Sequence, residues 1–306
     1  AWHEQTDELV ELSLEEGNLV FSLVANNRIY GVTNQNTLVE YDAQLTKVKT
    51  QSLFSEQADS EQCLAKFTSI EGALLDENTL VLQCAKLRIG SSSFLYQVDL
   101  QTGTLAKVPD SDGLFDSLLP LSSTTLLALD GSDYSGRAIK QFTWRESAIT
   151  NEAIFQDRGV GDNSVKQAMA FTARGNTLYY QGDSGEIRVL NQQSKVLEQS
   201  FSTEWRSPSE DLLVSADERW LARYNGYQLE VVNLEEQATH LIINSPHAIY
   251  ALALADKLGL VFAGDEMGAI TAYDMNSGEK IWTSPFQQAA VRDITLFDNQ
   301  QKLVHT

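Results

Sequence analysis

Basic residues are scarce in this chain. Only 22 Lys and Arg oppose 42 Asp and Glu over 306 residues, which gives a formal net charge of −20. Nucleic-acid binding needs clustered positive charge to neutralise phosphates, so the composition argues against a nucleic-acid partner. A strong charge of one sign keeps a β-rich protein from associating, and we expect a monomer. The alternative reading is that the acidic surface serves a specific cationic partner.

Long apolar runs are also missing. No segment approaches the roughly 20 apolar residues that a membrane-spanning helix needs, so we expect no membrane insertion. The sequence begins at Ala1 rather than Met. Removal of a signal peptide would explain this start and predicts a periplasmic or otherwise exported protein. A trimmed sequence would explain it equally, and then a cytoplasmic location stays open.

Cysteine is limited to Cys63 and Cys84. They lie at the outer ends of a predicted strand–turn–strand unit, 64–69 with 79–84, and would face each other in a symmetric hairpin. Opposed Cβ atoms lie about 4.5–5.5 Å apart, which allows a disulfide after a small adjustment. The alternative is two reduced thiols that pack as small apolar side chains. A disulfide would favour an oxidising compartment.

The usual catalytic motifs are absent as well. The sequence has no nucleophile elbow, phosphate-binding glycine loop, His-Glu-x-x-His or calcium-loop pattern. None of the four histidines has zinc-type spacing with a cysteine or another histidine; they are His3, His240, His247 and His305. We therefore assign no catalytic or metal-binding residue from motifs.

What the chain does contain is a repeat. The pattern of residues 33–42, a polar turn followed by an alternating strand that ends in Asp, returns in outline at 182–191, 224–233 and 264–274. A period of roughly 40 residues with several strands per unit predicts a β-propeller. Each third strand should end at a marker residue; the markers are Asp42, Asp99, Trp144 (in a degenerate copy), Asn191, Asn233 and Asp274.

Six strand pairs are expected upstream of these markers, and a seventh pair follows the last marker. They are 19–25 with 28–33, 64–69 with 79–84, 116–120 with 125–129, 167–172 with 177–181, 211–215 with 220–224, 249–254 with 260–263, and 291–297 with 302–306. The seventh pair lacks its outer strands. Residues 1–13 align without gaps with 272–284, so the N-terminus should supply them. We predict an all-β, single-domain propeller over 1–306, with seven four-stranded antiparallel blades and the last blade shared by 1–14 and 289–306. Six or eight blades are the alternatives.

The blade at 247–284 resembles the WD40 and quinoprotein propeller superfamily. Leu260–Asp265, Ile270–Asp274 and Ser277–Trp282 carry the likeness, although the Gly-His and Trp-Asp dipeptides of regular WD40 repeats are absent. The resemblance implies a fold and not an activity. Quinoprotein dehydrogenases use a quinone with Ca²⁺ and usually a vicinal cysteine pair. Cys63 and Cys84 are not vicinal, so we expect no cofactor.

Loops are where a rigid scaffold normally carries recognition. Predicted insertions and connections on one face contain our candidate partner-binding residues: Arg88, Tyr134, Arg137, Arg158, Trp205 and Arg206. Neutral drift is the alternative for the insertions, and packing against a neighbouring blade is the alternative for Trp205.

Two functions follow from this sequence. The first is a non-catalytic scaffold or accessory factor that binds an unidentified protein partner through its loop face. The second is a metal-dependent, lactonase-like hydrolase with its site at the mouth of the central channel. In that case Asp183 and Asp265 would be ligands, whereas the alternative makes them turn-forming residues.

Overall fold

A computed structural model describes most of the strand-forming parts of the chain. The described residues are 2–3, 15, 19–25, 28–35, 37–53, 72–84, 94–111, 113, 115–130, 138–145, 148–156, 171–181, 185–193, 196–205, 209, 211–285, 289–297 and 302–305. Within them the only helix is a short 3₁₀ turn, η1 (Asp256–Leu258). No helix in these ranges is long and apolar enough to cross a membrane.

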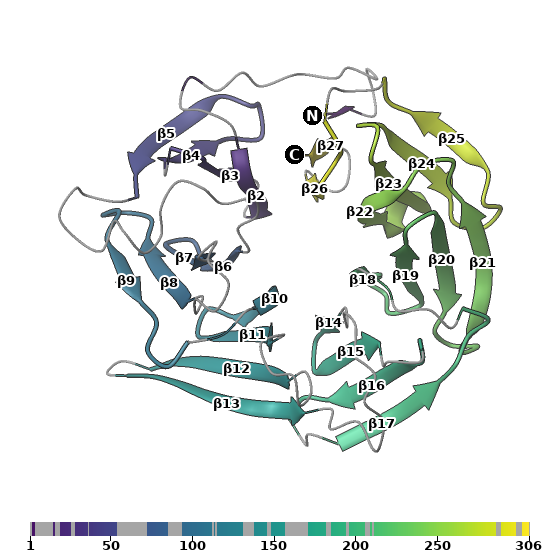
Figure 1. The fold of residues 1–306 in the computed structure, drawn as a ribbon, viewed down its shortest axis with the longest axis horizontal. Coiled ribbons are helices and arrows are strands. Elements are labelled where there is room, and N and C mark those ends of the chain that lie inside the picture. Colours follow the sequence, from purple (N-terminus) through teal and green to yellow (C-terminus); the bar gives the residue numbers. More distant parts are fainter. Residues whose placement is uncertain are drawn as a thin grey trace. The chain divides into compact units, whose positions relative to one another are not determined.

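The chain divides into two compact units, 10–164 and a second one made of 1–9 with 165–306. The first unit contains three four-stranded antiparallel sheets, each in chain order (Figure 1). Their strands are β2 (Leu19–Ala25), β3 (Arg28–Thr33), β4 (Thr37–Tyr41) and β5 (Lys47–Ser52); β6 (Gly72–Asp76), β7 (Thr79–Cys84), β8 (Phe94–Asp99) and β9 (Leu105–Lys107); and β10 (Phe115–Ser122), β11 (Thr125–Asp130), β12 (Ala138–Arg145) and β13 (Ala148–Gln156).

The second unit contains three further sheets of the same kind. Their strands are β14 (Phe171–Arg174), β15 (Thr177–Gln181), β16 (Ile187–Asn191) and β17 (Val196–Phe201); β18 (Asp211–Val214), β19 (Trp220–Asn225), β20 (Gln228–Asn233) and β21 (Ala238–Asn244); and β22 (Ile249–Ala255), β23 (Leu260–Asp265), β24 (Ile270–Asp274) and β25 (Lys280–Thr283). The six sheets are the blades of an all-β propeller.

A three-stranded sheet completes the second unit. It has the order β26 (Ile294–Phe297), β27 (Lys302–His305) and β1 (Trp2–His3). The first and last strands pair antiparallel, with Trp2 opposite Leu303 and His3 opposite Lys302. Trp2 therefore occupies the third-strand position that its alignment with Tyr273 predicts. The predicted fourth strand, within 4–14, lies outside the described residues.

Within each unit, the first strands of successive blades lie beside one another. The core fills the space between neighbouring blades. Tyr224, Leu252 and Tyr273, for example, belong to one buried cluster that the β18–β21 and β22–β25 blades share. Such packing needs strands that are buried on both faces, as Leu221–Tyr224 of β19 are, although Arg223 among them is charged.

Successive blades of the second unit are joined at one recurring place, where a second strand ends beside the start of the next blade. Gln181 Oε1 accepts a hydrogen bond from Ser209 N at 3.0 Å, and Tyr224 donates its hydroxyl to Tyr250 O at 2.7 Å. At the corresponding Gly264 there is no side chain, because a Cβ there would lie 2.5 Å from Val291 Cγ1. The same junction is thus formed in three ways: by a side chain that accepts a backbone N–H bond, by a hydroxyl that donates to a backbone carbonyl, and by a glycine that allows close packing.

The marker residues behave as predicted. All six lie at or directly beside the end of a third strand. Asp99 Oδ1 accepts backbone N–H bonds from Gln101 and Thr102, at 2.8 and 2.9 Å. Asp42, Asn191, Asn233 and Asp274 also accept backbone N–H bonds from the turns that follow them. The repeat is therefore maintained by turn-forming side chains, as Asp and Asn favour.

One predicted strand pair is wrong. The partner of β7 is Gly72–Asp76, with Gly72 opposite Leu82, and not 64–69. The turn that joins the two strands is the short Glu77–Asn78 segment, so the first strand must run directly up to it. This register does not place Cys63 opposite Cys84, and the geometric reason for a disulfide is lost. Cys63 lies outside the described residues, so the bond itself stays a prediction.

Candidate binding face

An ion pair without solvent exposure lies at the centre of the β18–β21 blade. Arg223 on β19 donates from Nε to Glu230 Oε2 on β20 at 2.6 Å, and both side chains are 0% exposed. The two residues are direct cross-strand partners. Burying two charges is unfavourable unless their remaining hydrogen-bonding groups are also satisfied.

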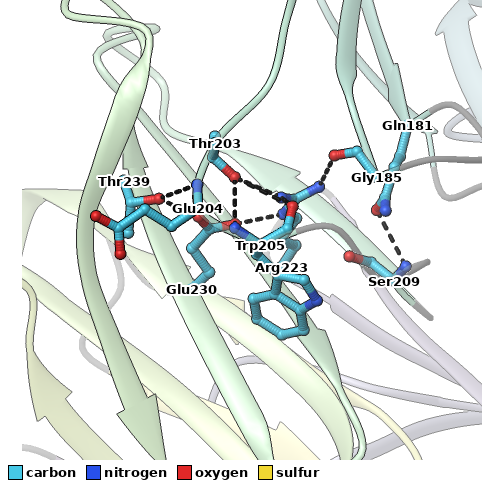
Figure 2. Close-up of polar contacts among 9 residues, drawn as sticks. All are labelled: Gln181, Gly185, Thr203, Glu204, Trp205, Ser209, Arg223, Glu230 and Thr239. Carbon is cyan, nitrogen blue, oxygen red and sulfur yellow. Dashed lines mark hydrogen bonds and ion pairs between the residues drawn. The ribbon is translucent and has the colours of Figure 1, made fainter.

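Those remaining groups are satisfied by neighbouring segments (Figure 2). Arg223 Nη1 donates to Gly185 O of the preceding blade at 2.8 Å, and Nη2 donates to Thr203 Oγ1 at 2.8 Å. Glu230 Oε1 accepts the Thr239 hydroxyl at 2.5 Å. The pair therefore joins two blades and the segment between them, which is a structural role.

Trp205 belongs to this buried network. Its side chain is 6% exposed, its carbonyl accepts Arg223 Nη2 at 3.0 Å, and its ring centroid lies 5.5 Å from the guanidinium carbon. The prediction of an exposed Trp205 anchor is wrong. Trp205 packs between blades, as the alternative predicted, and its indole covers the Arg223 guanidinium, which has no contact with water.

An exposed tyrosine stands on a tight turn of the same blade. Tyr227 and Gly226 form the two-residue turn between β19 and β20, where Gly226 has a φ of 52° and Tyr227 is 55% exposed. The carbonyls of both residues are bound by the connection to the next blade. Ser245 N donates to Tyr227 O at 2.8 Å, and Ile249 N donates to Gly226 O at 2.7 Å.

An exposed methionine stands on the matching turn of the next blade. Met267 is 48% exposed, and it lies between β23 and β24. Asp265 Oδ1 accepts N–H bonds from Met267 and Ala269, both at 2.9 Å, and Gly268 has a φ of 80°. The turn-forming role that we weighed for Asp265 is thereby confirmed.

One connection holds both turns. Residues 245–249, which bind the Tyr227 turn, also bind the Met267 turn: Glu266 N donates to Ala248 O at 2.8 Å, and Ala248 N donates to Glu266 Oε1 at 3.3 Å. We call residues 225–228, 245–249 and 265–269 the loop face. It presents an aromatic and a thioether side chain on backbone that hydrogen bonds fix.

The loop face is also acidic. Its sequence contains Asp265 and Glu266 but no Lys or Arg, and Glu266 is exposed. Tyr and Met are enriched in protein interfaces, whereas turns normally carry Gly, Asn, Asp or Ser. Tyr227 and Met267 are therefore unusual occupants of such turns.

Two carboxylates lie where first strands begin. Asp211 opens β18 and Asp293 directly precedes β26. Burial raises the pKa of Asp293 to about 6, and the negative charge of Asp211 adds to this rise. Burial also raises the pKa of Asp211, although a 2.7 Å bond from Leu212 N opposes the shift. Arg292, the neighbour of Asp293 in the sequence, places its guanidinium carbon 4.4 Å from the centroid of the Tyr250 ring.

The other predicted site residues cannot be placed. Arg88, Tyr134, Arg137, Arg158 and Arg206 lie outside the described residues, as do Cys63 and Asp183. Cys84 ends β7. Within the described ranges no group of three or more His, Cys, Asp or Glu side chains could hold a metal ion. His240 instead packs on Trp220, with their ring centroids 4.9 Å apart.

The fold and this face together define the class of protein: a β-propeller of small four-stranded antiparallel blades. No family model and no curated protein matches the sequence.

Proposed function

We propose that this chain is a protein-binding propeller that recognises its partner through the loop face. The observation that carries the proposal is the exposure of Tyr227 and Met267 on neighbouring turns that one connection holds in place. Preorganised anchors lose little conformational entropy on binding, and a few such residues supply most of the affinity of an interface. The finer architecture belongs to the same proposal: seven blades, of which the seventh is completed by 1–14 and 289–306.

The resemblance of 247–284 to WD40 and quinoprotein blades supports the proposal, because this segment forms part of the loop face. The absence of catalytic motifs from the sequence agrees with it. A periplasmic location stays a prediction and is not needed for binding.

The test compares exposed apolar residues on and off this face. A pull-down from the native host supplies a partner, which is then purified, and its Kd is measured with Tyr227→Ala, Met267→Ala and Ile281→Ala. Ile281 is 56% exposed on the outer strand β25, so it is a matched control. We expect at least about a tenfold loss for Tyr227→Ala or Met267→Ala and less than a twofold change for the control. Equal effects at all three positions would reject the loop face.

A second candidate, a metal-dependent hydrolase, is favoured by one observation. Asp211 and Asp293 lie close enough for one carboxylate to raise the pKa of the other, and a bound cation would relieve that repulsion. Metal analysis of the purified protein decides between the two functions. Stoichiometric Ca²⁺ or Zn²⁺ that is lost together with a hydrolytic activity in Asp293→Asn would replace the binding proposal.

A further inference from the structure

The loop face combines apolar exposure with charge of one sign, and this limits which partner could bind it. The segment 225–269, described without a gap, contains six carboxylates and a single cationic Lys or Arg side chain, Lys257. Lys257 lies in η1, between β22 and β23, and β23 runs its full length from there to the Met267 turn. The loop face itself thus contains no Lys or Arg, and Arg292, whose guanidinium carbon lies 4.4 Å from the centroid of the Tyr250 ring, lies outside it.

The two carboxylates of the loop face differ in their exposure and in their hydrogen bonds. Asp265 is buried and uses Oδ1 to hold the Met267 turn. Glu266 is exposed and accepts a long bond of 3.3 Å from Ala248 N through Oε1. Glu266 directly precedes Met267, so a group that covers the methionine would meet a carboxylate beside it. An opposite charge brought there gains from the low dielectric that the covered apolar surface creates.

We infer that the partner presents a basic apolar segment, in which Leu, Met or aromatic side chains contact Tyr227 and Met267 while flanking Lys or Arg side chains approach Glu266. Charge complementarity is the reason for this choice. The acidic chain as a whole would steer such a segment toward it, and the two apolar anchors would select the loop face from the rest of the acidic surface. The inference rests on the proposed function and specifies its partner class.

The probe is a nine-residue peptide that alternates lysine with leucine and phenylalanine, labelled with a fluorophore. Its binding to the full chain is followed by fluorescence anisotropy at low and moderate salt. A second peptide replaces each lysine with glutamate, and a third replaces each apolar residue with serine. We expect the basic apolar peptide to bind at least about tenfold more tightly than either relative, and to weaken as salt increases.

Variants of the chain locate the binding. Tyr227→Ser and Met267→Ser should each weaken the basic apolar peptide at least about fivefold, and Glu266→Gln should reduce both its affinity and the salt dependence. Glu236→Gln is the matched control. Glu236 is an exposed carboxylate in the turn between β20 and β21, at the opposite end of β20 from Tyr227, and its substitution should change the affinity less than twofold.

The outcomes separate this inference from the proposed function. If the glutamate peptide binds as well as the lysine peptide and Tyr227→Ser abolishes both, the basic partner is wrong and the loop face stands. If the basic peptide binds but the serine variants have no effect, the acidic surface binds it without selection, and the basic partner class is overturned while the Kd comparison with Ile281→Ala still tests the loop face. If none of the three peptides binds, the basic partner class is overturned, and the Kd comparison with Ile281→Ala still tests the loop face.

Discussion

Arg223 and Glu230 form a hydrogen-bonded ion pair, 2.6 Å between Nε and Oε2, from which solvent is fully excluded. Such a pair needs both members. Removing one leaves the other charged, buried and unpaired, which costs about 3–5 kcal/mol. Because the network also contains Gly185 and Thr203, a lost arginine would additionally detach the preceding blade from the segment before β18.

We therefore expect Arg223→Met to lower the free energy of unfolding by about 3–5 kcal/mol in urea denaturation. The double variant Arg223→Met/Glu230→Leu should recover part of this loss, because no charge is left without a partner. Arg28→Met is the control. Arg28 also pairs with a glutamate, Glu40, but its side chain is 48% exposed, so its loss should cost much less stability than the loss of Arg223. Similar losses for the two single variants would contradict the structural role of the network.

A second prediction concerns the junction at Gly264. Gly264→Ala places a Cβ 2.5 Å from Val291 Cγ1 and 2.7 Å from Val291 Cβ, so the two blades must separate slightly. We expect a loss of about 1–3 kcal/mol by thermal or urea unfolding. Adding Val291→Ala should restore part of the stability, because it removes Val291 Cγ1, the nearer of the two contacting atoms, while Cβ remains.

Gly175→Ala separates this steric effect from backbone strain. Gly175 has a φ of 52°, and a Cβ there would meet no atom within 4 Å. Its substitution should cost about 1 kcal/mol, and Val291→Ala should not change that cost. Rescue of both variants by Val291→Ala would refute the steric explanation.

The third prediction is a pH dependence at Asp293. Its pKa is raised from 3.8 to about 6 in the folded chain, so folding favours the protonated acid. This contribution to stability is fully present below pH 3.8 and is lost as the pH rises toward 6. Asp293→Asn cannot ionise, so its free energy of unfolding should rise relative to that of the wild type across this window. At pH 7.5 the variant should be more stable than the wild type by at most about 3 kcal/mol.

Urea denaturation at pH 4 and pH 7.5 measures the difference. Asp274→Asn provides a control of the opposite sign, because hydrogen bonds from Ser277 lower the pKa of Asp274. They stabilise the folded chain above the ordinary pKa of 3.8, and this contribution is lost as the pH falls through the lowered pKa. Asp274→Asn should therefore lose stability at pH 7.5 relative to the wild type. An Asp293→Asn variant that is equally destabilised at both pH values would show that its carboxylate is needed as a hydrogen-bond acceptor.

Much of the propeller could be predicted from local chemistry. In five of the six four-stranded blades an Asp or Asn at the end of the third strand forms its own turn, and Trp144 takes that place in the other. The pattern therefore survives even where the strands themselves vary. β6 was misplaced because residues 64–69 look like a strand, whereas pairing with β7 is decided by the length of the turn at Glu77–Asn78. Local propensity does not contain that information.

The sites were harder to predict, because exposure depends on neighbouring blades. Trp205 follows a strand and lies shortly before a Ser-Pro pair, which is typical of a surface loop. In the structure Trp205 is buried, because its carbonyl and its ring both contact the buried Arg223 guanidinium. The sequence does contain two signals of these sites. Arg223 and Glu230 are charges within otherwise apolar strands, and Tyr227 and Met267 are apolar residues beside turn glycines.

Because β1 pairs with β27, strands from both ends of the sequence must come together during folding. Trp2 and Leu303 can meet only after the polypeptide between them has become compact, since contacts across long sequence separations are slow to form. Every other strand pair among the described residues joins strands that are consecutive in the sequence. The β1–β27 pairing should consequently be the last β-pairing to form during refolding and the first to break under mechanical force.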